Sequence, residues 1–196
     1  MRINEIFYSL QGEGRYAGTA AIFIRFAGCN LNCEFCDTKH QTYKIYTNDE
    51  LLREIAKYKP CDRVILTGGE PTLQITAEFI NLLVDNGYLV NIETNGTRPL
   101  PRFADVYWVV CSPKFEFCDK ADIKLDWIDE LKVVYRGKEQ DMSKYDEIDA
   151  TFRYLQPCDT GDIDTNKRII KEAVEFIKQN PQWRLSLQTQ KIIGIR

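Results

Sequence analysis

Short, nearly continuous apolar runs alternate along this chain with longer segments in which apolar residues recur at helical spacing. The run Ala20–Phe26 lies between Gly18 and Gly28, and its only charged side chain is Arg25. Such a run predicts a strand that is buried on both faces. Comparable runs predict strands over Arg63–Leu66, Tyr88–Glu93, Val106–Val110 and Trp183–Leu187, and further apolar runs lie at Leu131–Val134 and Phe152–Leu155.

Helices are predicted between several of these runs. Thr47 and Glu50 have the spacing of a capping box, and the apolar residues that follow recur at helical spacing until Pro60. A second helix is expected over Ile75–Asn86, where Gly87 is placed to end it in the left-handed conformation. A third is expected to begin near Asp164 or Thr165 and to continue to Ile177.

Because strands and helices alternate, the sequence predicts an α/β fold with a mostly parallel sheet and crossover helices, open or partly closed. Reactive loops in such folds follow the carboxyl ends of the strands. The motifs described below stand at such positions, which predicts a single active-site face. Residues 1–196 are expected to form one domain, in which the charged stretch 119–147 is an elaborated surface segment.

Composition and charge exclude several classes of protein. With 44% hydrophobic and 28% charged residues, the 196-residue chain is neither disordered nor fibrous. A formal net charge of −3 argues against a surface that binds duplex nucleic acid. No apolar run approaches the roughly 20 residues that span a bilayer, and the first residues do not resemble a signal peptide. We therefore expect a cytoplasmic protein without nucleic-acid or membrane partners.

Three of the seven cysteines form the pattern Cys-x3-Cys-x2-Cys at Cys29, Cys33 and Cys36. A structural zinc site uses four ligands, usually in two pairs, and the sequence has no second pair of this kind. A 4Fe-4S cluster held by three cysteines keeps one iron open for another ligand. The spacing alone favours the cluster and leaves zinc as the alternative.

A second motif, Gly68-Gly69-Glu70-Pro71, follows the predicted strand Arg63–Leu66. By itself it would indicate a turn. Together with the cysteine pattern it resembles the radical S-adenosylmethionine (SAM) superfamily. The resemblance implies a trimmed partial (β/α) barrel with a 4Fe-4S cluster and SAM. It also implies that Phe35 lies against the adenine, and that Gly68, Gly69 and Glu70 lie near the SAM amino group.

Further motifs, from Ile6 to the last residue, resemble the 7-carboxy-7-deazaguanine synthases of the queuosine pathway. They are Tyr8–Gly14, Phe23–Leu31, Cys36–Thr38, Glu93–Thr97, Cys111–Lys114, Gln156–Pro157 and Ser186–Thr189. Enzymes of that family convert 6-carboxy-5,6,7,8-tetrahydropterin to 7-carboxy-7-deazaguanine and ammonia. The resemblance implies that a reduced cluster cleaves SAM, and that the resulting 5′-deoxyadenosyl radical takes a hydrogen from C6 before the ring contracts. It also implies a homodimer and a flavodoxin-like or similar electron donor.

The resemblance places substrate contacts at Leu10, Gln11, Gly12, Glu13, Arg25, Thr94, Gln190 and Arg196. Leu10 to Glu13 would offer backbone groups, an amide and a carboxylate to the guanidine-like edge of the pterin, unless they form only a turn between two strands. Arg25 would be costly if left unpaired in an apolar strand. Its partner is expected to be the substrate carboxylate, and the alternative is a structural ion pair with Asp or Glu.

The remaining expected contacts are with magnesium and SAM. Thr38 matches a magnesium-binding threonine, although Asp37-Thr38 could also be a helix cap or turn. Expected SAM contacts, besides Phe35 and the Gly-Gly-Glu segment, are Cys36, Asp37, Asn95, Gly96, Ser112, Pro113, Lys114, Gln156, Pro157, Cys158 and Asp159.

Two positions depart from the family pattern. Gln190 replaces a histidine and cannot shuttle a proton at neutral pH. Arg196 replaces a proline whose terminal carboxylate contacts the substrate. A glycyl-radical activase would share both main motifs, and a zinc-bearing binding module would share the cysteines. The first alternative is distinguished by Gln11–Gly14, Arg25 and Thr38, and the second by metal analysis.

Overall fold

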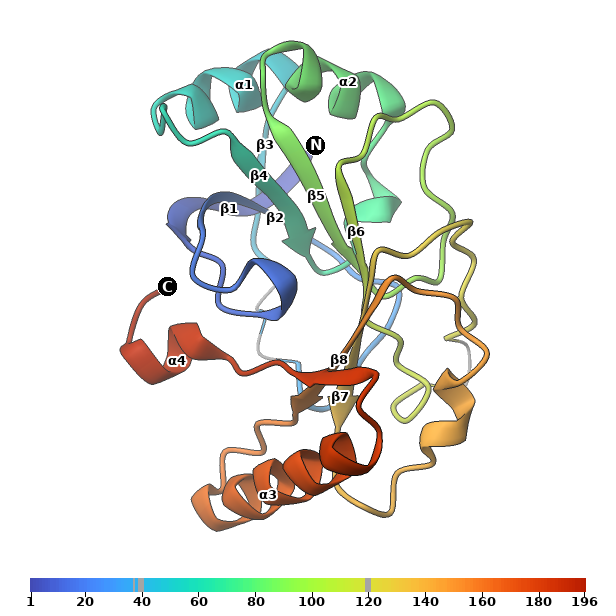
Figure 1. Cartoon of the computed structure of the whole chain (residues 1–196). Helices are drawn as coiled ribbons and strands as arrows, with labels where there is room; N and C mark the ends of the chain where they lie inside the picture. The colour runs from blue at the N-terminus through green and yellow to red at the C-terminus, as the bar shows by residue number, and fades with distance from the viewer. Residues whose placement is uncertain (37, 39–40, 119–120) are drawn as a thin grey trace.

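The computed structural model describes residues 1–36, 38, 41–118 and 121–196. Its strands form one twisted, open sheet in the order β3-β1-β2-β4-β5-β6-β7-β8-β9 (Figure 1). Neighbouring strands from β2 to β9 are parallel, whereas β1 is antiparallel to β2 and β3. The strands are β1 Arg2–Leu10, β2 Ala20–Phe26, β3 Lys44–Ile45, β4 Arg63–Gly68, β5 Leu89–Thr94, β6 Trp108–Cys111, β7 Glu130–Tyr135, β8 Phe152–Pro157 and β9 Trp183–Leu185. This mostly parallel, barrel-like arrangement confirms the expected fold class.

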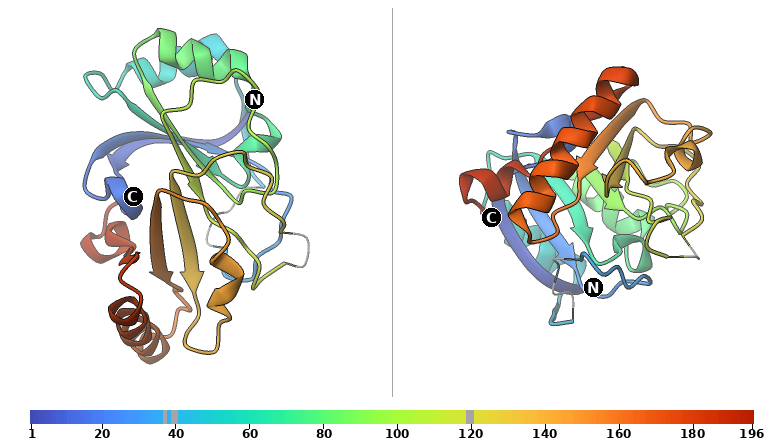
Figure 2. Two further views of the ribbon diagram at one scale, coloured as in Figure 1. Left: turned by 45° about the vertical axis from the view of Figure 1, so that its right-hand side comes forward. Right: turned by 90° about the horizontal axis from the view of Figure 1, so that it is seen from below.

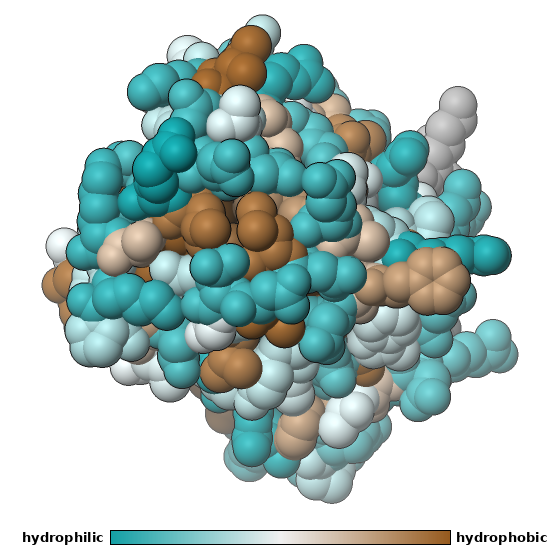
Figure 3. Space-filling model, turned by 90° about the horizontal axis from the view of Figure 1, so that it is seen from above, coloured by the Kyte–Doolittle hydropathy of each residue, from teal (hydrophilic) through white to brown (hydrophobic). Residues whose placement is uncertain are grey.

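Of the described α-helices, the first three cover the outer face of the sheet at its two ends, and the last lies against the loop that follows β1. They are α1 Asn48–Ala56, α2 Ala77–Asp85, α3 Ile163–Gln179 and α4 Thr189–Ile193, with short 3-10 helices at Gly14–Tyr16, Pro71–Leu73 and Met142–Tyr145. One apolar core lies between β2, β4, β5 and the helices α1 and α2. A second lies between β7, β8 and α3, which crosses the other end of the molecule (Figure 2). The surface over α1 and α2 is largely hydrophilic around a central group of apolar side chains (Figure 3).

Local sequence signals explain where the helices begin and end. The Thr47 hydroxyl accepts from the Glu50 amide and the Glu50 carboxylate accepts from the Thr47 amide, which confirms the capping box. The Thr76 and Asp162 side chains each accept one backbone amide at the start of α2 and α3, so both helices begin close to their predicted positions. Gly87, with φ of +80°, follows α2 as predicted.

Three features of the chain differ from the sequence-based expectation. The N-terminal strand β1 was not predicted. The charged stretch 119–147 is not only a surface segment, because it contains β7, in which every residue is buried. Among the described residues, no α-helix lies between β5 and β6 or between β6 and β7, so the alternation of strand and helix is incomplete.

The inner face of the sheet is the one that matters for function. Because side chains alternate along a strand, β2 sends Ile22 and Ile24 to the outer core and leaves Arg25 on the inner side. The same alternation places Glu93 of β5 and Lys132 of β7 on the inner side. The sheet therefore carries its main apolar cores on the outer side, while its concave side mixes charged residues with apolar ones such as Phe7 and Phe23.

Candidate active site

A cavity of about 290 Å³ opens on the inner side of the sheet, near the carboxyl ends of β2, β4, β5 and β6. It brings together most of the residues singled out in the sequence. Of those, the cavity is lined by Leu10, Gln11, Gly12, Glu13, Arg25, Cys29, Cys33, Phe35, Cys36, Thr38, Gly68, Gly69, Thr94, Asn95, Ser112, Lys114, Gln156, Gln190 and Arg196. The motifs thus meet on one face of the sheet, as expected, and its role as the active site stays a prediction. Asp37 lies outside the described residues.

The three cysteines of the motif lie on the loop that follows β2, which we call the cysteine loop (residues 29–36), and all three line the cavity. Burial raises the pKa of Cys29, and it raises the pKa of Cys33 to about 11. Within the described residues, no three His, Cys, Asp or Glu side chains are already gathered as a metal site. Three soft thiols on one loop beside an open cavity fit a cluster that keeps one iron free.

Gly68 and Gly69 hold the end of β4 against the start of the cysteine loop. The Gly69 amide donates to the Phe26 carbonyl (3.0 Å), and the Glu70 amide donates to the Gly28 carbonyl (2.9 Å). A Cβ on Gly69 would lie 2.0 Å from the Gly28 oxygen, and one on Gly68 would lie 2.3 Å from the Phe26 oxygen. Both glycines are therefore required by this close backbone approach, whatever ligand binds beside them.

Glu70 does not line the cavity, because its side chain is 0% exposed. One of its carboxylate oxygens accepts from the Thr72 amide and hydroxyl and from the Thr94 hydroxyl (2.7 Å), and the other accepts from the Asn95 amide (2.8 Å). The expected contact of Glu70 with the SAM amino group stays a prediction. In this structure Glu70 fixes the loop that follows β5.

That loop, in turn, supports the cysteine loop. The Asn95 side-chain amide donates to the Asn30 side chain (3.1 Å) and lies 4.0 Å from the Cys29 sulfur. Gly96 has φ of +82°, and a Cβ there would lie 2.6 Å from the Cys111 sulfur, so only glycine fits. Gly96 is thus behind the cavity wall rather than in it.

Lys114 is a buried cation beside the cysteine loop. Its ammonium donates to the Ser112 carbonyl (2.5 Å) and hydroxyl (2.6 Å), and it lies 6.0 Å from the centre of the Phe35 ring. Burial lowers the pKa of Lys114. Phe35 packs against Phe117, with ring centres 4.2 Å apart. Pro113 is buried and does not reach the cavity.

Residues after β8 line a smaller neighbouring cavity of about 60 Å³. Pro157, Cys158 and Asp159 belong to this second cavity, which shares Phe35 and Gln156 with the first. Asp159 pairs with Lys191 of α4 (2.8 Å), and hydrogen bonds from Lys191, Gly161 and Asn166 lower its pKa to about 2. These three expected SAM contacts therefore lie beside the main cavity.

Arg25 enters the cavity with its charge already partly paired. Its Nε donates to Glu5 (2.7 Å), and its Nη1 donates to the Thr38 hydroxyl (3.2 Å). The Arg196 guanidinium contacts the other Glu5 oxygen (2.5 Å), and the Arg196 carbonyl accepts from Ser9. The structural ion pair considered for Arg25 is therefore present. The Arg25 and Arg196 guanidinium groups share the Glu5 carboxylate at this part of the wall.

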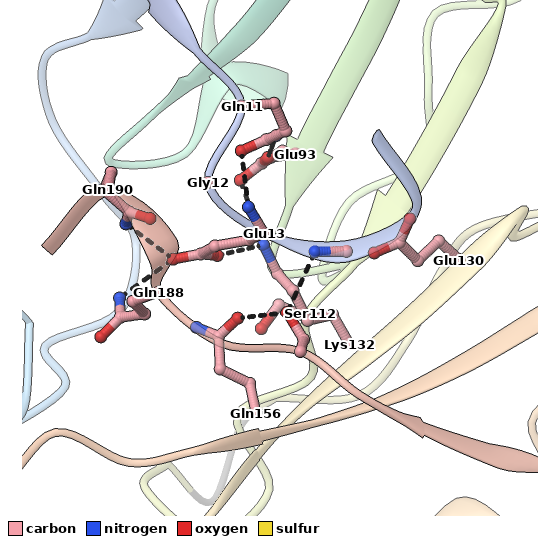
Figure 4. A network of polar contacts seen from close by, with 12 residues as sticks. Gln11, Gly12, Glu13, Glu93, Ser112, Glu130, Lys132, Gln156, Gln188 and Gln190 are labelled. Atoms are coloured by element: carbon pink, nitrogen blue, oxygen red, sulfur yellow. Dashed lines mark hydrogen bonds and ion pairs between the residues drawn. The ribbon is translucent and has the colours of Figure 1, made fainter. Parts of the chain in front are cut away.

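A second charged group, on the inner side of β5 and β7, has a negative excess (Figure 4). Lys132 lies between Glu13 (2.6 Å) and Glu93 (3.4 Å), and its side chain is 6% exposed. Burial would raise the pKa of Glu13, but the charge and hydrogen bond of Lys132, with hydrogen bonds from Gln188 and Gln190, lower it to about 2. Burial would lower the pKa of Lys132, but the charges of Glu13 and Glu93 raise it above its usual value.

Residues 186–196, here called the C-terminal segment, close one side of the cavity. Gln188 and Gln190 both donate to Glu13, and Thr189 donates twice to the Gly12 carbonyl. A Cβ on Gly12 would lie 1.7 Å from the Gln190 side-chain oxygen, so these two side chains can be adjacent only because Gly12 has none. The Gln190 oxygen is buried without a hydrogen-bond partner in the described part of the chain.

Sequence reasoning missed Glu5, Glu93 and Lys132. Each is a charged residue at an inward position of a strand, which is the same signal that identified Arg25. Lys132 could have been found in the apolar run Leu131–Val134, since an unpaired charge there would be costly.

Comparisons with known proteins agree with this site. A model of the radical SAM superfamily matches residues 23–110. The 7-carboxy-7-deazaguanine synthase of Bacteroides thetaiotaomicron is 50% identical over 100% of this chain and 98% of its own, and that of Burkholderia multivorans is 36% identical over 98% of each chain.

A structural comparison gives the same answer as the sequence matches. The crystal structure of QueE from Escherichia coli superposes with a TM-score of 0.77 at 30% identity, covering 96% of this chain and 93% of that one. The full-length similarity extends across the cysteine loop, the Gly-Gly-Glu segment and the C-terminal segment. The chain therefore belongs to the 7-carboxy-7-deazaguanine synthase family of radical SAM enzymes.

Proposed function

We propose that this chain converts 6-carboxy-5,6,7,8-tetrahydropterin to 7-carboxy-7-deazaguanine and ammonia. The observation that carries the proposal is one cavity with three different walls. The cysteine loop forms one wall, the guanidinium groups of Arg25 and Arg196 mark the second, and a negative group around Glu13 and Glu93 forms the third. A carboxylated pterin has a carboxylate on one ring and a guanidine-like donor edge on the other, so its two ends match the second and third walls.

The cysteine loop supplies the ligands of the 4Fe-4S cluster through Cys29, Cys33 and Cys36. When bound, the cluster and SAM supply the radical that removes a hydrogen atom from the substrate. The protein's own residues position the reactants and limit the access of water. Phe35, Ser112 and Lys114 would contact SAM beside the cysteine loop, and their position in the lining of the cavity supports this role.

Substrate binding falls to the residues away from the cysteine loop. The Arg25 guanidinium would donate hydrogen bonds to the substrate carboxylate while Glu5 holds it in place. Thr94 lines the cavity with its hydroxyl fixed by Glu70. Gln190 can offer hydrogen bonds but no proton transfer, so this enzyme would not use that position as an acid or base.

Thr38 would bind magnesium next to the substrate carboxylate. Its hydroxyl is 3.2 Å from the Arg25 Nη1, so one oxygen ligand already lies at the second wall. Magnesium prefers oxygen ligands and keeps several waters, and a single threonine with substrate oxygens suits it. The test is turnover at fixed substrate and SAM while magnesium is varied. Full activity in the presence of a chelator would contradict this role.

Three wider features complete the proposal. We place the enzyme in the cytoplasm, where thiols stay reduced. No described helix is long and apolar enough to cross a membrane. A flavodoxin-like protein would reduce the cluster, and two chains would form a homodimer. Sedimentation of the purified protein and reduction of its cluster by a purified flavodoxin test these two points.

The decisive experiment uses anaerobically reconstituted protein, the pterin, magnesium and a reductant, with and without SAM. Mass spectrometry should find 7-carboxy-7-deazaguanine only when SAM is present. Metal analysis of the same sample should give iron and sulfide in near-equal amounts. Absence of product would favour the glycyl-radical activase alternative, and zinc without sulfide would favour a binding module.

A further inference from the structure

Glu13 and Glu93, the two acidic side chains of the negative wall, differ in how many hydrogen bonds their carboxylate oxygens accept. Glu13 accepts from Lys132 (2.6 Å) on one oxygen and from Gln188 (2.9 Å) and Gln190 (3.2 Å) on the other. A carboxylate has about four acceptor positions, so three close charged or amide donors leave Glu13 nearly saturated. Its side chain is also the less exposed of the two, at 14%.

Glu93 has acceptor capacity to spare. Among the described residues, one oxygen accepts from Gln11 (2.7 Å), while the other has a single, long contact, with Lys132 (3.4 Å). Its side chain is 21% exposed, and it lines the main cavity. The lysine compensates part of the charge of both acids, but one ammonium between two carboxylates leaves a negative excess at this wall. A ligand that brings two adjacent N–H groups would satisfy the oxygens that remain open.

The position of Glu93 in the sheet fixes its relation to Arg25. Arg25 pairs with Thr67 of β4, and Leu66 pairs with Ile92 of β5, so Arg25 and Glu93 stand at the same level two strands apart. Neighbouring strands are about 4.8 Å apart, which puts the two residues roughly 10 Å from each other along the sheet. A bicyclic ring with a carboxylate at one end and an amino group at the other can bridge such a distance.

We propose that Glu93, held by Gln11 and Lys132, binds the 2-amino and N3–H donors of the pterin and so selects a 2-amino-4-oxo ring over a 2-oxo ring. Glu13 then serves to anchor Lys132 and the C-terminal segment. This differs from the expectation that Glu13 itself binds the guanidine-like edge. The inference rests on the proposed function, because it assigns an edge of that substrate.

The test compares two substrates on cluster-loaded enzyme. One is 6-carboxy-5,6,7,8-tetrahydropterin, and the other is the tetrahydrolumazine analogue, which has oxygen in place of the 2-amino group. The wild-type protein should bind the pterin about 10- to 100-fold more tightly, as expected for the loss of a charged hydrogen bond. In Glu93→Gln the preference should fall to within about threefold, since an amide accepts and donates equally well.

Glu13→Gln is the matched control, because it removes a carboxylate from the same network. It should keep the preference for the pterin even if it weakens the binding of both compounds. Glu93→Asp, which retains the charge, should keep part of the preference. In Glu93→Gln, KM for the pterin should rise while kcat at saturation changes less.

The outcomes separate this inference from the proposed function. Loss of the preference in Glu93→Gln alone supports the assignment. A preference retained in Glu93→Gln, or lost equally in both variants, would overturn it while wild-type turnover of the pterin leaves the proposed function intact. Cluster content and circular dichroism of each variant identify a protein that has simply failed to fold, in which case Glu93→Asp decides the question.

Discussion

Replacing Lys132 by methionine should destabilise the protein in a pH-dependent way. The lysine is the cation that lets Glu13 stay ionised in a buried position, where its pKa is about 2 instead of 4.5. That difference corresponds to about 3 kcal/mol, since one pKa unit is worth about 1.4 kcal/mol. Breaking a buried ion pair from one side costs about 3–5 kcal/mol, which agrees in size.

The sign of the pH dependence follows from the depressed pKa. In the wild-type protein, ionised Glu13 stabilises the fold above pH 4.5, and this contribution is lost as the pH falls towards 2. Without Lys132, the hydrogen bonds from Gln188 and Gln190 remain, but the burial of Glu13 is no longer offset by a neighbouring positive charge, so its ionised form is less stable than in the wild type. The difference in the free energy of unfolding between wild type and variant should therefore be largest near pH 7 and smaller at pH 4.

Thermal and urea unfolding of cluster-free, reduced protein at the two pH values measures this directly. About 3 kcal/mol corresponds to a drop of roughly 6–12 °C in Tm for a chain of this size. Lys57→Met is the control, because Lys57 is paired with Glu54 on the exposed surface of α1 and should change nothing measurable. A loss under about 1 kcal/mol at pH 7, or an equal loss at pH 4, would refute the reasoning.

Three further predictions test the site. Cys33→Ala should abolish the iron-sulfur absorbance of reconstituted protein, whereas Cys61→Ala should retain it; a coloured Cys33 variant would contradict the ligand assignment. Gly69→Ala should lower cluster occupancy and SAM affinity, because the added Cβ would lie 2.0 Å from the Gly28 oxygen; unchanged SAM binding by calorimetry would count against it. Arg25→Ala should raise KM for the pterin about 10- to 100-fold while SAM cleavage persists, and an unaltered KM would exclude its role in binding the carboxylate.

Hydrophobic patterning predicted most of the sheet because the parallel strands are buried on both faces. The strand β1 escaped prediction for an identifiable reason. A register shift between Ile3 and Glu5 breaks the alternation, so Ile3 and Ile6 reach the outer core although they are three residues apart. A strand with such an irregularity has no clear period of two in its sequence.

The site was predicted in part, and the rest depends on contacts between distant segments. The cysteine loop and the Gly-Gly-Glu segment are local motifs, so the sequence alone identifies them. The Glu70 carboxylate accepts hydrogen bonds from Thr94 and Asn95, which lie 24 and 25 residues further along the chain. Likewise, Lys132 meets Glu13 across 119 residues. No local sequence pattern predicts whether Glu13 or Glu93 has a carboxylate oxygen that can accept a further hydrogen bond.

The central claim is that the cavity holds a carboxylated pterin with its C6 hydrogen within reach of the radical derived from SAM. The most direct measurement uses pterin labelled with deuterium at C6, SAM and reconstituted protein under anaerobic conditions. The pterin equals 7-carboxy-7-deazaguanine plus ammonia in atoms and electrons, so the hydrogen taken from C6 must be returned and SAM is re-formed. Mass spectrometry should therefore find deuterium from C6 in the SAM recovered after turnover and in any 5′-deoxyadenosine that is released alongside 7-carboxy-7-deazaguanine. Formation of that product with no deuterium in the recovered SAM or the 5′-deoxyadenosine would contradict the account.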